Sequence, residues 1–72
     1  MTLEEKLALL EETIEAEAGS LKPEMALDEV EEYNSLTSLG VVIMLEDDFG
    51  KKVSGADMRK LKTVQDILNL MQ

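Results

Sequence analysis

The chemistry open to this chain is narrow, because the sequence contains no cysteine and no histidine. Their absence removes the thiolate nucleophile, the commonest general base and the commonest metal ligand. Carboxylates are plentiful, but no base, nucleophile or metal-ligand constellation accompanies them, so we expect a protein that is not an enzyme and binds no metal. The residue that stands out is a hydroxyl, Ser35, between the acidic window 28–32 and the long apolar run that leads to residues 46–48.

Ser35 follows Asn34, a residue type that favours the N-cap position of a helix. The hydroxyl is therefore expected in the first turn of a helix, where backbone N–H groups are unpaired and the helix dipole is positive. A phosphate ester on this oxygen would lie in favourable surroundings and would be reachable by a modifying enzyme. Many serines at helix starts meet the same conditions, so spacing alone also fits an ordinary helix cap.

The elements that must position Ser35 are predicted to be helices. Thr2 and Glu5 form a capping box, Gly19 is a natural stop, Asn34 and Gly50 bound the central helix, and Thr63 caps the last one. We expect an all-α bundle of three main helices and one short helix, with a long first loop around Pro23. The predicted helices are 2–19, 34–50, 55–60 and 63–72.

Apolar residues at helical spacing indicate which faces turn inward. The first loop also carries apolar residues that are candidates to pack against the helices. The expected inward residues are Met25, Leu27 and Val30 of the loop, Val41, Val42, Leu45 and Phe49 of the central helix, and Val64, Ile67, Leu68 and Met71 of the last helix.

The net charge of −9 is unevenly distributed along the 72 residues. Residues 1–48 hold 14 acids and two lysines, whereas residues 49–72 hold two acids and five bases. This balance speaks against nucleic acid and anionic membranes and favours partners with basic patches. No apolar run is long enough to span a membrane, and the N-terminal residues do not read as a signal peptide. We therefore expect one domain, 1–72, that is monomeric and cytoplasmic.

Three blocks of the sequence together resemble the acyl carrier protein family. Members carry Asp-Ser-Leu at the start of their second helix, a Leu-Glu-x-x-Phe pattern at its end, and Thr-Val-x-Asp opening the last helix. The matching strings here are "NSL" at 34–36, "LEDDF" at 45–49 and "TVQD" at 63–66, and the spacing between them agrees without a gap. The resemblance covers the whole chain, although the first loop is short for the family.

The resemblance implies a role for each block. Ser35, flanked by Asn34 and Leu36, would receive a 4′-phosphopantetheine arm from coenzyme A, transferred by a magnesium-dependent phosphopantetheinyl transferase. The thiol of the arm would carry acyl intermediates of fatty-acid, polyketide or related biosynthesis as thioesters, and the helix faces could part to shelter the chain. The residues implied to contact the basic patches of partner enzymes are Met44, Glu46, Asp47 and Asp48.

The chain departs from the family pattern beside the serine. Asn34 replaces the usual aspartate, and Thr37 and Gly40 stand where acidic residues are common. Asparagine caps a helix as well as aspartate does, so the departure concerns recognition by the transferase and not the fold. Two other readings remain: an aminoacyl or peptidyl carrier, and an unmodified acidic adaptor that keeps the carrier fold as a docking surface.

Overall fold

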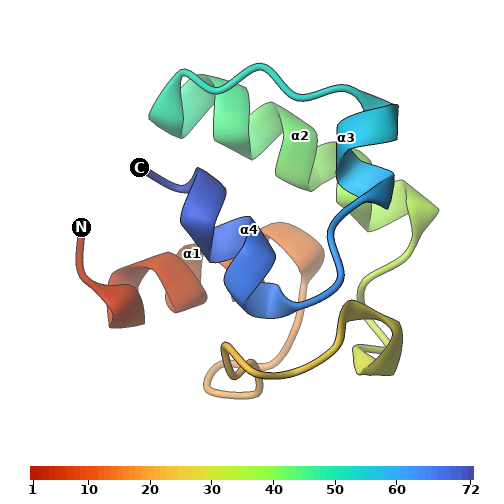
Figure 1. Ribbon diagram of the computed structural model, residues 1–72. Coiled ribbons are helices and arrows are strands. Elements are labelled where there is room, and N and C mark those ends of the chain that lie inside the picture. The colour runs from red at the N-terminus through yellow and green to blue at the C-terminus, as the bar shows by residue number, and fades with distance from the viewer.

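Four α-helices and one short 3-10 helix, with no β-strand, make up the protein (Figure 1). A computed structural model describes all residues from 1 to 72. The elements are α1 (Leu3–Ile14), η1 (Leu27–Glu29), α2 (Ser35–Phe49), α3 (Gly55–Arg59) and α4 (Val64–Leu70). α1 packs against both α2 and α4. The predicted all-α bundle is confirmed. No helix here combines the length and hydrophobicity needed to cross a bilayer.

Each α-helix begins with a capping box, in which a side chain at the N-cap and one three residues later exchange hydrogen bonds with the backbone. The boxes satisfy N–H groups that a helix start would otherwise leave unpaired. This confirms the predicted caps at Thr2, Asn34 and Thr63. The four pairs are Thr2 and Glu5, Asn34 and Thr37, Ser54 and Asp57, and Thr63 and Asp66.

The end of α1 differs from the prediction. The helix stops at Ile14, and Glu15 takes the left-handed conformation with φ 60°. The N–H groups of Glu15 and Ala16 then donate to the carbonyls of Glu12 and Glu11, which is the Schellman arrangement. Gly19 also has positive φ, but it lies in a later turn. The first loop is consequently longer than predicted and covers residues 15–34.

That loop is held against the bundle by main-chain and side-chain contacts. The Leu27 N–H donates to the Lys62 carbonyl at 2.8 Å, and the Val64 N–H donates to the Met25 carbonyl at 2.9 Å. Near the loop's start, the Leu21 N–H donates to a carboxylate oxygen of Glu11 at 3.0 Å. The loop is thus fixed at several points before it reaches α2.

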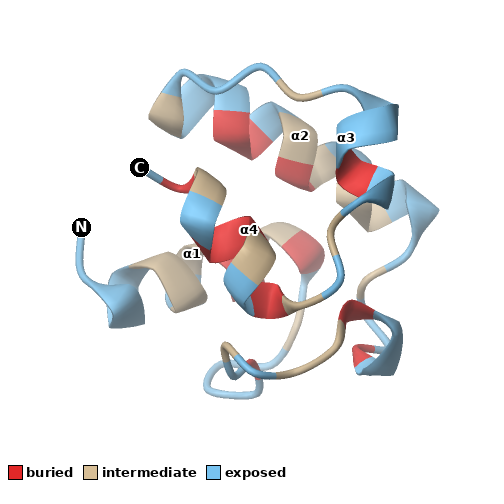
Figure 2. Ribbon diagram, in the orientation of Figure 1, coloured by how far each residue is buried: buried red, intermediate tan, exposed pale blue.

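One apolar core joins all these elements (Figure 2). The predicted inward residues of the last helix are all buried, as are Leu27 and Val30 of the loop. Met25, Val42 and Phe49 are half-buried and pack against the core. The buried apolar residues are Leu10, Ile14, Leu21, Leu27, Val30, Val41, Met44, Leu45, Met58, Val64, Ile67, Leu68 and Met71.

Candidate functional site

Ser35 is the first residue of α2, and its side chain is exposed. Asn34 fixes this helix start, because its Oδ1 accepts from the N–H groups of Leu36 and Thr37, both at 2.9 Å. Thr37 completes the box by accepting from the Asn34 N–H at 2.9 Å. The serine is therefore at a rigid helix beginning, open to solvent, where the sequence placed it.

The hydrogen bonds at this helix start leave the hydroxyl and the N–H of Ser35 without partners. The Ser38 hydroxyl donates to the Ser35 carbonyl at 3.0 Å, and the Thr37 hydroxyl donates to the Glu32 carbonyl at 2.7 Å. Neither the Ser35 hydroxyl nor its N–H has a partner among the protein's hydrogen bonds. An anion esterified to Ser35 Oγ would consequently find an unused backbone donor at the positive end of the α2 dipole.

A groove of about 600 Å³ opens directly beside Ser35. Its walls come from η1, the residues just before α2, the first turns of α2, and α3 with Leu61 shortly after it. The volume lies within the range of small-molecule sites, and half of the lining residues are hydrophobic. The hydrophobic lining residues are Leu27, Tyr33, Leu39, Val42, Met58 and Leu61.

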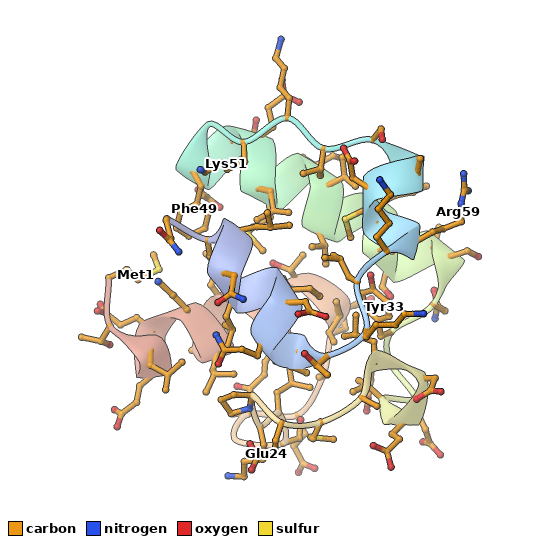
Figure 3. All side chains as sticks on the ribbon, viewed as in Figure 1. Met1, Glu24, Tyr33, Phe49, Lys51 and Arg59 are labelled. Carbon is orange, nitrogen blue, oxygen red and sulfur yellow. The ribbon has the colours of Figure 1, made fainter.

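Tyr33 forms part of the groove wall between η1 and α2 (Figure 3). Its ring is half-buried and packs against the core. Burial raises the pKa of the phenol above its usual value near 10, because the phenolate would lose hydration there. Tyr33 therefore stays neutral near pH 7, and it contributes an apolar surface with one hydroxyl to the groove.

The acidic residues proposed for partner contact lie at the far end of α2. Glu46, Asp47 and Asp48 are all exposed, in the last turn before Phe49. At 1.5 Å per residue, Glu46 is about 16 Å along the helix from Ser35. The structure places the serine and these acids on one helix without bringing them together.

Met44 does not belong to the exposed contact surface, and that expectation is wrong. Its side chain is 5% exposed because it shares a helix face with Val41 and Leu45, which both point into the core. The apolar residues that α2 does expose are Leu36, Leu39 and Ile43, at 76%, 60% and 60%. Their spacing of three and four residues marks one outer stripe, which the sequence pattern contained and the inward assignment overlooked.

Comparison with known proteins fits this geometry. A family model described as the phosphopantetheine attachment site matches residues 7–71. The chain belongs to the acyl carrier protein family. It is 30% identical over 69 residues to the acyl carrier protein of Thermosynechococcus vestitus, covering 96% of this chain and 85% of that protein. It is 32% identical over 72 residues to the acyl carrier protein of Myxococcus xanthus, covering 94% and 91%.

A solved structure supports the carrier fold. The solution structure of holo acyl carrier protein from Geobacter metallireducens matches with a TM-score of 0.72 at 21% identity, covering 99% of this chain and 83% of that one. The prosthetic group implied by the family is 4′-phosphopantetheine. The residues here suit it, because an exposed hydroxyl, an unpaired N–H and an adjoining groove lie together at the start of α2.

Proposed function

We propose that this protein carries acyl groups as thioesters on a 4′-phosphopantetheine arm attached to Ser35. The observation that carries the proposal is the exposed Ser35 hydroxyl on the first residue of α2, in the lining of the groove. The arm, when bound, supplies the terminal thiol that a chain without cysteine lacks. The protein's own part is to present that arm and to shelter what it carries.

Attachment would join Ser35 Oγ to the pantetheine-bearing phosphate of coenzyme A, with loss of adenosine 3′,5′-bisphosphate. The hydroxyl proton must go to a base, and the sequence neighbours Asn34, Leu36 and Ser38 supply none, because they are neutral. We assign the base and the magnesium ion to a phosphopantetheinyl transferase. Chemistry on the cargo likewise belongs to partner enzymes, which makes this protein a carrier rather than a catalyst.

The groove supports an acyl cargo over an aminoacyl or peptidyl one. Its lining includes Leu27, Val42 and Met58, and a hydrocarbon chain placed against them would be removed from water at about 25 cal/mol per Å² of apolar surface. The groove also holds two charged residues, Asp28 and Arg59. The partner enzymes determine whether the pathway makes fatty acids, polyketides or related products.

We place the contact surface for partner enzymes along α2. Glu46, Asp47 and Asp48 follow one another at the helix C-terminus, where the dipole disfavours acids by about 0.3–1 kcal/mol each. A cost at this position is consistent with a role in binding, and basic patches of acyl-loading and acyl-transferring enzymes would compensate it. The outer stripe Leu36, Leu39 and Ile43 would supply the apolar part of the contact. A cytoplasmic location stays a prediction.

Intact mass measurement tests the attachment. Co-expression with a broad-specificity phosphopantetheinyl transferase should add the mass of one arm to the wild type and none to Ser35→Ala. Ser38→Ala is the matched control, because Ser38 lines the same groove and should leave modification intact. No added mass with any transferase would favour the unmodified adaptor.

We also expect Asn34→Asp to raise the initial rate of modification.

A further inference from the structure

Arg59 is the only cation in the groove beside Ser35. Residues 33–45 contain no charged side chain, so α2 supplies no charge near the serine. Arg59 is the last residue of α3, and Asp28 of η1 is the other charged residue of the lining. In a chain of net charge −9, this groove carries one positive and one negative side chain, so the surroundings of the attachment residue are less acidic than the molecule as a whole.

The Arg59 guanidinium is also unengaged. The side chain is exposed, donates to no side-chain or backbone acceptor, and forms no ion pair with Asp28. One of its nitrogens, Nη1, lies 4.0 Å from the position that a Cβ on Gly55 would take, at the start of α3. At that distance a side chain at Gly55 would make only ordinary van der Waals contact with the guanidinium. Figure 3 shows Arg59 extending outward from α3.

We propose that Arg59 binds the phosphodiester through which the arm is attached to Ser35, an inference that rests on the proposed function. A phosphodiester keeps one negative charge at neutral pH, and guanidinium donors match two of its oxygens at once. The Ser35 N–H and the Arg59 guanidinium would be the donors that this chain offers to the anion. This contact would limit the motion of the arm where it joins the protein, beside the apolar residues of the groove.

The contact also offsets repulsion that modification creates. Attaching an anion to a protein with 16 acids and seven bases increases its net negative charge. Arg59 can meet this anion without leaving another carboxylate unpaired, since it has no ion-pair partner to lose. Asp28 also lines the groove but forms no ion pair with Arg59.

The test compares apo and holo forms of Arg59→Gln with those of Lys60→Gln. Lys60 is the neighbouring exposed residue outside the groove lining, so both variants lose one positive charge and only one loses it at the site. Mass measurement first shows that every holo sample carries the arm. ³¹P NMR of the holo proteins then reports the phosphodiester, and thermal unfolding reports the energetic effect.

We expect the ³¹P resonance of the holo protein to shift in Arg59→Gln and to stay in place in Lys60→Gln. Arg59→Gln should lower the Tm of the holo form by about 2–4 °C more than that of the apo form, and 1 M salt should remove the difference.

Equal ³¹P positions in both variants would overturn the proposal. An equal loss of Tm in apo and holo Arg59→Gln would show that Arg59 stabilises the protein independently of the arm, and would overturn the contact. Failure to attach any arm would overturn both the proposed function and this contact, whereas an attached arm without the shift overturns the contact alone.

Discussion

At the scale of single residues, Glu11 is unusual because it is a carboxylate in the core. It is 5% exposed, whereas glutamate is almost never fully buried without a partner. Its partner is the Leu21 N–H, which donates to Oε2 at 3.0 Å across ten residues of sequence. Glu11 thereby satisfies a buried backbone donor in a loop that has no regular structure at that point, and ties the loop to α1.

Replacing Glu11 should separate this hydrogen bond from simple packing. Glu11→Ala leaves the Leu21 N–H buried without an acceptor, and we expect a loss of about 1–3 kcal/mol in the free energy of unfolding. Glu11→Gln keeps a carbonyl acceptor and should lose less. Glu12→Ala, an exposed neighbour, should change stability by no more than about 0.5 kcal/mol. Urea unfolding measures all three, and equal losses for Glu11→Ala and Glu12→Ala would contradict the assigned role.

At the scale of elements, helix starts were predictable and the first helix end was not. Caps such as Thr2 and Asn34 depend on side chains within three residues, so a short window of sequence contains the information. The end of α1 depends on Glu15 adopting a left-handed conformation ahead of the more obvious Gly19, because the loop must turn toward its tertiary contacts. Nothing in the local pattern around Glu15 indicates that turn.

The site shows the same division between local and tertiary information. Ser35 and its cap were predicted because they are neighbours in sequence. The assignment of Met44 to the surface failed because inward and outward faces of a nearly continuous apolar helix differ by one residue in phase. The groove and the approach of Arg59 required α3 and η1 to be placed in space, which no motif specifies.

Gly40 allows a direct test of how closely α1 and α2 approach. It lies inside α2, and a Cβ built there would be 3.6 Å from both Cγ2 and the carbonyl oxygen of Thr13 in α1, which is ordinary van der Waals contact. Gly40→Ala should therefore fit and raise the free energy of unfolding by about 0.5–1 kcal/mol through helix propensity. Gly50→Ala, at φ 66°, should lower it. Loss of stability in Gly40→Ala would mean that the helices pack more tightly than 3.6 Å implies.

At the scale of the whole molecule, the capping carboxylates couple the fold to pH. Hydrogen bonds from the capped backbone and hydroxyl groups hold the pKa values of Glu5, Asp57 and Asp66 below their usual values. Each carboxylate is therefore more stable as an anion in the folded state than in the unfolded chain. Protonation of these three carboxylates weakens the starts of α1, α3 and α4 together. The same acidification also lowers the overall negative charge of the protein.

Asp66 gives the sharpest measurement of this coupling. Its Oδ2 accepts from the N–H groups of Lys62 and Thr63, at 2.8 and 3.0 Å. Because the folded pKa lies below the unfolded value near 4, the stabilisation is complete above about pH 4 and is lost as pH falls through the folded pKa. Asp66→Asn keeps an acceptor and removes the charge. The Tm gap between wild type and variant should be constant at neutral pH and close in acid; a gap independent of pH would contradict this account.

The position of Tyr33 has an optical consequence. The sequence contains no tryptophan and no second tyrosine, so near-ultraviolet absorption at 280 nm comes from one ring in the groove wall. Any chain that enters the groove changes the solvation of that ring. If cargo occupies the groove as we propose, the fluorescence and the alkaline spectral titration of Tyr33 will distinguish an empty carrier from a loaded one without a label.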